Sequence, residues 1–181
     1  MIRLKNILTE LQDKEISTLL DKINNKQFRF FDQGDNGRVY EIDDEDKLFK
    51  ITTESEEFEV ASVIVGRKGE FDAFIPIYYV NEKKLLYIMS KADSLTGNDR
   101  QNIEQFLQGY KSYAREMGGE VSIFDYLSDD GARDLDQEVV SFLRSLQTEI
   151  GKMGIADLEL NLDFKTDNVM RWQGRLVLID W

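Results

Sequence analysis

The first stretch of the chain repeats apolar residues at the three- and four-residue spacing of an amphipathic helix. This pattern predicts one helix over residues 2–13 and a second over residues 15–25, with a break near residues 13–14. We expect both helices to pack on the domain that follows, with binding of a partner as the alternative. The apolar positions that define them are Ile7, Leu8, Leu11, Ile16, Leu19, Leu20 and Ile23.

From residue 28 the period changes to the apolar–polar alternation that is typical of strands. A helical stretch over residues 53–66 follows the third of these strands and ends at a glycine. Because short turns separate the other strands, we expect an antiparallel five-stranded sheet with one inserted helix. The predicted strands cover residues 28–31, 38–42, 47–52, 74–80 and 84–90.

After residue 92 the strand pattern stops and helical spacing returns. We expect helices over residues 99–116, 123–127 and 135–153, the last with a buried apolar stripe. The chain is therefore predicted to be an α+β protein in three parts. These are a helical extension over residues 1–27, a strand-rich lobe over 28–92 and a helical lobe over 93–181.

Composition narrows the possible chemistry. The 181 residues are 41% hydrophobic and 32% charged, which is ordinary for a globular protein. The absence of histidine and cysteine excludes Ser-His-Asp hydrolysis, thiolate catalysis and the zinc sites that need those ligands. Carboxylates, lysines, hydroxyls and oxygen-bound metal ions remain, and this set suits Mg²⁺-dependent phosphoryl transfer.

Charge and hydropathy limit the partners. The net charge of −12 opposes binding to nucleic acid. No apolar run approaches the roughly 20 residues that a membrane helix needs, so we expect no membrane contact. The first residues lack the apolar run of a secretion signal and the sequence has no cysteine, so we expect a cytoplasmic protein.

The last twenty residues carry the strongest chemical signal. Asp163 is followed five residues later by Asn168, and a short apolar strand over residues 176–179 leads to Asp180. In phosphoryl transfer an Asp can orient or deprotonate a hydroxyl, and an Asn amide oxygen can hold Mg²⁺. A second aspartate reached through the strand would supply a charged metal ligand.

Two earlier features fit the same chemistry. Gly34 and Gly37 sit in a turn between two predicted strands, where backbone amides can approach phosphate oxygens, although the turn alone favours a plain hairpin connection. Lys50 lies on the next strand and shares a face with Leu48. We choose Glu59 on the following helix as its partner, with Glu56 and Glu57 as alternatives.

These segments, in this order, resemble the protein kinase-like superfamily, including its aminoglycoside-type phosphotransferase branch, over residues 28–181. The family's Gly-x-Gly-x-x-Gly-x-Val loop is similar to residues 32–39, with Asp32 at the first glycine position. Its Val-Ala-Ile-Lys strand looks like residues 47–50, and its Asp-Leu-Lys-x-x-Asn loop looks like residues 163–168. The family's Asp-Phe-Gly motif would begin at Asp180, and the resemblance implies a two-lobe kinase-like fold.

The resemblance also implies a site for ATP and Mg²⁺. The backbone of residues 34–37 would cover the ATP phosphates, and Val39 belongs to the same loop. Lys50, held by Glu59, would contact the α- and β-phosphates. The other implied roles are hydroxyl orientation or base catalysis by Asp163, charge neutralisation by Lys165, adenine contacts from the backbone of Ser90 and Ala92, and Mg²⁺ ligation by Asn168 and Asp180.

The sequence departs from the family at two further places. Asn161 and Leu162 replace the usual His and Arg, which argues against regulation by a phosphorylated activation loop. Trp181 follows Asp180 directly and is the last residue, so we expect a minimal form without the activation segment and the distal helices, with a domain cut short as the alternative. A protein partner or self-association would then complete the short helical lobe.

The leading expectation is an ATP/Mg²⁺-dependent phosphotransferase that acts on a protein or a small-molecule hydroxyl. The alternative is a pseudokinase that serves as a nucleotide-binding or purely protein-interaction module. The missing activation segment favours the pseudokinase, whereas Lys50, Asp163, Asn168 and Asp180 favour transfer. A structural or assembly protein that uses the fold without nucleotide is a third possibility.

Overall fold

The chain divides into two compact units. The first comprises Met1–Gly66 and Ile77–Lys91, and the second comprises Arg67–Pro76 and Ala92–Trp181. The computed structural model describes residues 2–67, 69–118, 121–129, 133, 135–155, 158, 162 and 164–181, with side chains from residue 13 onward. Within these ranges no helix combines the length and the apolar character needed to cross a membrane.

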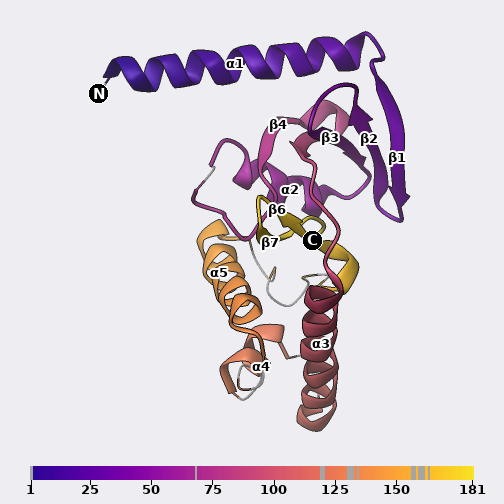
Figure 1. Ribbon diagram of the computed structural model, residues 1–181, viewed down its shortest axis with the longest axis vertical. Coiled ribbons are helices and arrows are strands. Elements are labelled where there is room, and N and C mark those ends of the chain that lie inside the picture. The colour runs from indigo at the N-terminus through magenta and orange to yellow at the C-terminus, as the bar shows by residue number, and fades with distance from the viewer. Residues whose placement is uncertain are drawn as a thin grey trace. The chain divides into compact units, whose positions relative to one another are not determined.

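The first unit is built on a five-stranded antiparallel sheet in the order β1-β2-β3-β5-β4 (Figure 1). Helix α2 (Ser55–Ile64) follows β3 and precedes β4 along the chain. The predicted α+β class and the antiparallel five-stranded sheet with one inserted helix are therefore confirmed. The strands are β1 (Phe28–Gly34), β2 (Gly37–Ile42), β3 (Lys47–Thr52), β4 (Ile77–Asn81) and β5 (Leu86–Ser90), and a short 3₁₀ turn η1 (Glu82–Lys84) joins the last two.

The chain begins with one long helix, α1 (Ile2–Asn24), seen at the indigo end of the ribbon (Figure 1). The prediction of two helices broken near residues 13–14 is wrong. Asp13 and Lys14 interrupt the apolar pattern, but neither is a glycine or a proline, so the backbone continues helically through them. The Lys22 ammonium fastens the helix to the β2–β3 turn through the Asp43 carbonyl and the Glu45 carboxylate, each at 2.8 Å.

Helices α1 and α2 cover opposite faces of the sheet, because successive residues of β3 point to opposite sides. Phe49 packs in an apolar cluster with Leu19 of α1, and Lys50 pairs with Glu57 of α2. The predicted alternation along this strand is confirmed. The buried members of the α1-side cluster are Leu19, Ile42, Phe49, Leu86 and Ile88.

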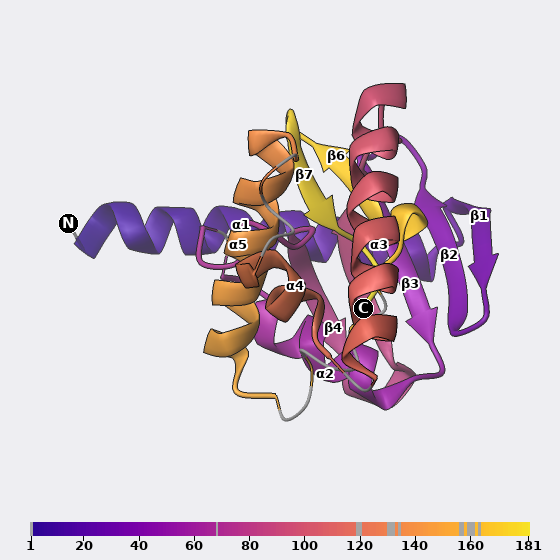
Figure 2. The ribbon, with the colours of Figure 1, turned by 90° about the horizontal axis from the view of Figure 1, so that it is seen from below.

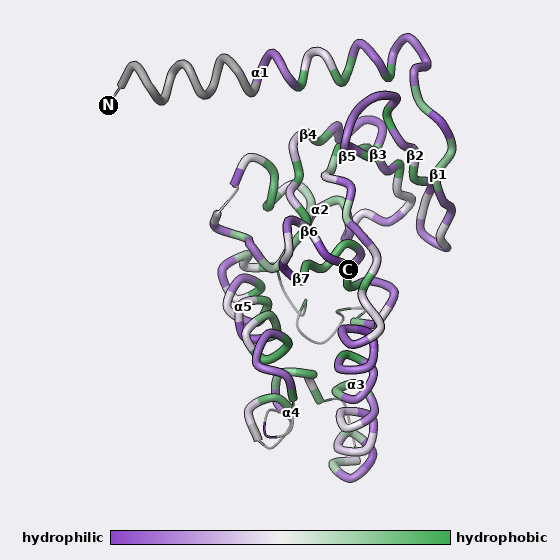
Figure 3. The backbone as a smooth tube through the Cα atoms, in the orientation of Figure 1, coloured by the Kyte–Doolittle hydropathy of each residue, from purple (hydrophilic) through white to green (hydrophobic). Residues whose placement is uncertain are grey.

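In the described residues, the second unit contains the helices α3, α4 and α5 and a small hairpin (Figures 1 and 2). The predicted stripe of α5 is buried, and its apolar residues gather along one side of the helix (Figure 3). Helix α5 contacts β7, and α3 contacts the 3₁₀ turn that precedes β6. The elements are α3 (Gly97–Met117), α4 (Ile123–Asp129), α5 (Gln137–Met153), η2 (Thr166–Asn168), β6 (Val169–Trp172) and β7 (Arg175–Leu178).

The segment Arg67–Pro76 belongs to the second unit, although the sequence pattern placed residues 74–80 in one strand of the sheet. The Ile75 N–H donates to the Leu178 carbonyl at 2.9 Å, and the Leu178 N–H donates to the Ala73 carbonyl at 2.8 Å. Pro76 lacks the N–H that would carry a ladder past this point. Strand β4 therefore starts at Ile77, and the predicted strand is wrong in its first three residues.

A substitution at Gly37 tests how closely β2 approaches β3. A Cβ at this position would lie 2.4 Å from the Ile51 carbonyl oxygen, whereas a Cβ at Gly34 would meet open space. We expect Gly37→Ala to lower the free energy of unfolding by about 2 kcal/mol, because backbone atoms cannot yield without separating the strands. Gly34→Ala is the matched control, with a change within about 0.5 kcal/mol. Urea unfolding measures both, and equal losses would contradict the close approach.

Candidate functional site

Lys50 sits on the middle strand of the sheet and is the cross-strand partner of Val39 on β2 and of Tyr87 on β5. Directly opposite residues share a face, so these three side chains lie on the side that α2 covers. Lys50 is only 5% exposed. Because a buried ammonium is costly without a counter-charge, the burial of this lysine demands a carboxylate close by.

That carboxylate belongs to Glu57, whose oxygen lies 2.7 Å from the Lys50 Nζ. The prediction that Glu59 pairs with Lys50 is wrong, and one of its two alternatives is the observed partner. The reason is the phase of α2, whose buried stripe repeats at helical spacing and leaves Glu59 exposed. The buried residues of α2 are Glu57, Phe58, Val60, Ala61 and Ile64.

Two hydroxyl groups from the sheet also hold Glu57. The Tyr87 hydroxyl donates to the same oxygen that faces Lys50, and the Thr52 hydroxyl lies 2.7 Å from the other oxygen. Sequence reasoning missed both residues, because neither lies in a recognisable motif. Lys50, Thr52, Glu57 and Tyr87 form what we call the lysine–glutamate cluster, and each of its members is at most 5% exposed.

The glycine turn (residues 34–37) closes the hairpin of β1 and β2, with Gly34 and Gly37 paired across it. The Asn36 carbonyl at its tip accepts the Thr53 N–H at 2.8 Å and lies 2.9 Å from the Thr52 hydroxyl. The turn is thus tied to the residues that join β3 to α2. Its expected role in covering phosphates stays a prediction.

A hollow of about 370 Å³ lies beside the glycine turn. Tyr40 and Ile51 line it, and both alternate with Lys50 and its cross-strand partner Val39 along their strands. The hollow therefore opens on the face of the sheet opposite to the lysine–glutamate cluster. The other lining residues are Gln33, Gly34, Asp35, Gly37, Arg38 and Thr53.

Ser90 and Ala92, the predicted adenine-contacting residues, follow one another closely at the end of β5. Ser90 is buried, and its hydroxyl shares a 2.9 Å hydrogen bond with the Tyr78 hydroxyl. Ala92 is half-buried and opens the second segment of the second unit. Between them, the Lys91 N–H donates to the Asp46 carbonyl at 3.3 Å. The adenine contact itself stays a prediction.

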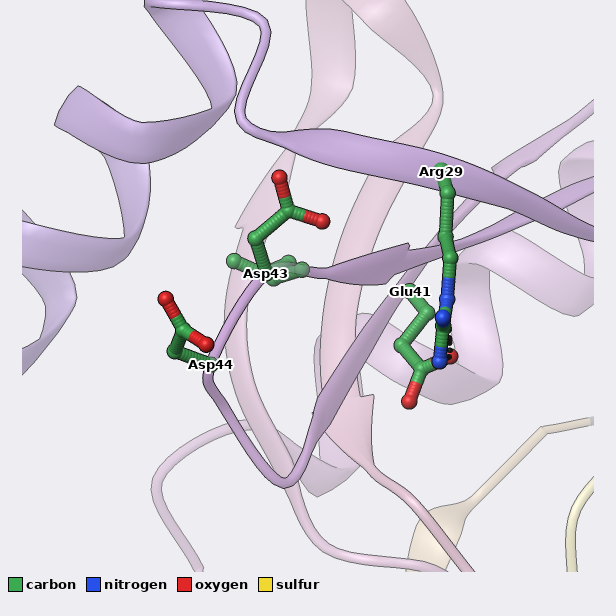
Figure 4. A pocket seen from close by; sticks show the side chains of 5 residues that line it. Arg29, Glu41, Asp43 and Asp44 are labelled. Atoms are coloured by element: carbon green, nitrogen blue, oxygen red, sulfur yellow. Dashed lines mark hydrogen bonds and ion pairs between the residues drawn. The ribbon is translucent and has the colours of Figure 1, made fainter.

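An acidic hollow of about 330 Å³ lies at the β1–β2 edge of the sheet (Figure 4). The side chains of Arg29 and Glu41 line it and point toward one another, with a guanidinium nitrogen 2.6 Å from a carboxylate oxygen. Asp43 and Asp44 come from the turn after β2. Lys91 also contacts Glu41 at 2.6 Å. Hydrogen bonds from Lys91 and then from Arg29 hold the pKa of Glu41 below its usual value.

In the second unit a hairpin carries the predicted metal ligands. We call residues 166–180, which include η2, β6 and β7, the aspartate hairpin. Asn168 is buried, and its carbonyl accepts the Ile179 N–H at 2.9 Å, so Asp180 follows directly on the residue opposite Asn168. The exposed Lys165 precedes the hairpin, and its carbonyl accepts the Asn168 N–H at 3.0 Å. Asp163 lies outside the described residues.

The aspartate hairpin supplies some, but not all, of the oxygen ligands that a hard cation such as Mg²⁺ needs. An amide oxygen from Asn168 and a carboxylate from Asp180 are ligand types that Mg²⁺ accepts, with substrate phosphates and water filling the other positions. Among the residues that the structure describes, no group of three or more acidic side chains could hold a metal ion. Any metal bound here therefore depends on oxygen atoms from outside these two side chains.

Arg171 holds the aspartate hairpin in place. Its guanidinium forms a two-pronged contact with Asp99 of α3 at 2.6 and 2.7 Å, and a second with Glu138 of α5 at 2.8 and 2.9 Å. Its backbone N–H and carbonyl both pair with Asp93. Sequence reasoning missed this cluster, because Asp99 and Arg171 are 72 residues apart. Hydrogen bonds from Arg171 are the main reason that the pKa of Asp99 lies far below its usual range.

Compared by sequence with models of known protein families and with curated proteins, the chain matches none of them. The assignment of function therefore rests on the residues and their geometry.

Neutralising Glu57 tests the buried pair. We expect Glu57→Gln to lower the free energy of unfolding by about 3 kcal/mol, because it removes a carboxylate that lies 2.7 Å from a buried ammonium. Glu59→Gln makes the same chemical change two residues away at an exposed position, and we expect an effect within about 0.5 kcal/mol. Urea unfolding compares the two variants with the unsubstituted protein. Similar losses from both substitutions would argue against the assigned partner.

Neutralising Asp99 tests the Arg171 cluster through pH. A carboxyl whose pKa is lowered by folding stabilises the protein above its unfolded pKa of about 4, and this stabilisation is lost as pH falls toward the folded value. We expect Asp99→Asn to cost about 2 kcal/mol at neutral pH and progressively less below about pH 4. Asp167→Asn, at a side chain that is 78% exposed, is the control. A cost that stays constant down to about pH 3 would contradict the ionic role of Asp99.

Proposed function

We propose that this protein is a kinase-like phosphotransferase that uses ATP and Mg²⁺ to phosphorylate a hydroxyl of a protein or small molecule. The observation that carries the proposal is the buried Lys50–Glu57 pair, joining β3 of an antiparallel sheet to the helix that follows it. A lysine held by a helical carboxylate is the arrangement that kinase-like proteins use to bind nucleotide phosphates. The two-lobe kinase-like fold is part of the same proposal.

The proposed roles divide between the two units. In the first unit, Lys50 binds the phosphates and Glu57 keeps its ammonium oriented. In the second, Asn168 and Asp180 hold Mg²⁺, which supplies charge neutralisation at the phosphates. The aspartate hairpin supports this assignment, because its backbone hydrogen bonds bring Asn168 next to the residue before Asp180.

The proposed transfer needs no reactant other than ATP and the acceptor hydroxyl. The acceptor oxygen bonds to the γ-phosphorus, the bond from that phosphorus to the bridging oxygen breaks, and ADP leaves. Asp163 takes the proton of the acceptor hydroxyl, and the Lys165 ammonium neutralises charge on the transferred group. These two roles follow the resemblance of residues 163–168 to the family's catalytic loop.

A nucleotide-binding module without transfer activity is the second candidate. Its support is that the buried Lys50–Glu57 pair would bind nucleotide phosphates whether or not transfer follows. ATP binding alone does not distinguish it from the transferase, whereas phosphoryl transfer does.

Ligand-induced stabilisation tests the shared part of both candidates. We expect ATP with Mg²⁺ to raise the Tm by roughly 5–10 °C at about a hundredfold excess over the Kd. Asp180→Asn should remove the dependence of this shift on Mg²⁺, and Asp167→Asn in the same segment should preserve it. The absence of any shift in the unsubstituted protein would overturn the proposal.

A transfer assay with γ-labelled ATP then separates the two candidates. Label that moves to the protein itself or to an added hydroxyl compound identifies the transferase. Nucleotide binding without movement of the label, under conditions where a known kinase transfers it, identifies the second candidate.

A further inference from the structure

The Thr52 hydroxyl lies between the glycine turn and the Glu57 carboxylate, to which the proposed function gives separate roles. It lies 2.7 Å from a carboxylate oxygen of Glu57 and 2.9 Å from the carbonyl oxygen of Asn36 in the glycine turn. It also accepts the Glu54 N–H at 3.0 Å, just before α2 begins. Thr52 is 3% exposed, so water does not compete freely for these contacts.

A hydroxyl carries a single hydrogen, whereas this one faces two acceptors. The bond to the carboxylate is the shorter one and is charge-assisted, so it is the stronger of the two. The Asn36 carbonyl keeps the Thr53 N–H at 2.8 Å even when the hydroxyl turns away. The hydroxyl hydrogen of Thr52 is therefore shared between the Asn36 carbonyl and the Glu57 carboxylate. A movement of either acceptor changes the strength of the hydrogen bond to the other.

We propose that Thr52 is a positioning residue whose hydroxyl couples the glycine turn to the Glu57 carboxylate, and through it to the Lys50 ammonium. The coupling is a property of the first unit alone, since all of these residues lie within it. Its consequence for nucleotide binding rests on the proposed function. A ligand whose phosphates engage Lys50 would also bias the glycine turn, and the turn would influence how firmly Lys50 is held.

Substitution of Thr52 separates this coupling from simple packing. Thr52→Val keeps the shape and removes the hydroxyl, and Thr52→Ser keeps the hydroxyl. Thr53→Val is the matched control, because the Thr53 hydroxyl approaches the same Asn36 carbonyl at 3.3 Å and is exposed. Within the described residues, no hydrogen bond from the Thr53 side chain to Glu57 accompanies that approach.

Amide hydrogen exchange in the ligand-free protein is the decisive measurement. We expect Thr52→Val to speed exchange by about three- to tenfold both in residues 34–37 with Thr53 and in the first turn of α2. Thr52→Ser should restore both segments, and Thr53→Val should affect the glycine turn only. A change in only one segment, uniform acceleration throughout the sheet, or failure of serine to restore protection would each overturn the coupling.

Binding measurements then test the consequence for nucleotide. We expect Thr52→Val to weaken the affinity for ATP with Mg²⁺ by about three- to tenfold while leaving that for adenosine, which has no phosphates, unchanged. Thr52→Ser should recover the ATP affinity. If the variants show the expected exchange pattern but the unsubstituted protein binds no ATP, the proposed function fails and the coupling stands. If ATP binds but both affinities fall equally in Thr52→Val, the link from Thr52 to phosphate binding is wrong.

Discussion

A buried ion pair is stable only while hydrogen-bond partners surround both of its charges, and this constraint organises the sheet-bearing unit. Lys50 and Glu57 are both nearly inaccessible to water, so β3 and α2 keep the relative phase that brings them together. The hydroxyls of Thr52 and Tyr87, which lie on sheet strands, donate hydrogen bonds to the Glu57 carboxylate. The same Thr52 hydroxyl reaches the glycine turn, so one ion pair fixes the strand, the helix and the turn as a group.

In the second unit an arginine, Arg171, holds several elements together through its carboxylate partners. The Arg171 guanidinium presents its donors in a flat fork that suits two carboxylates at once, here Asp99 and Glu138. Each carboxylate lies in the first turn of its helix, where a negative charge is favoured. Arg171 therefore joins the starts of α3 and α5 to β6, and it steadies the hairpin that carries Asn168 and Asp180. A buried Glu149 adds a further tie by accepting two backbone N–H groups from residues 72–73.

These two polar clusters differ in what they offer to chemistry. The lysine–glutamate cluster holds an ammonium in a fixed position, and the Arg171 cluster holds the hairpin that carries Asn168 and Asp180. Burying charge is an expensive way to gain stability, and apolar residues of similar size commonly serve as well. Their presence therefore supports a function that depends on held charges, which is the basis of the proposed phosphotransferase.

The sequence by itself determined the elements whose signal is local. The alternation in β3, the glycine turn and the apolar stripe of α5 each depend on neighbouring residues, and each formed as predicted. Only the tertiary structure decided the rest. The choice of Glu57 over Glu59 depended on how α2 meets the sheet, and the split at Pro76 depended on pairing with Leu178. Arg171 contacts Asp99 and Glu138, which lie 72 and 33 residues away along the chain. Such contacts leave no periodic trace along the chain, because they exist only once separate elements have packed.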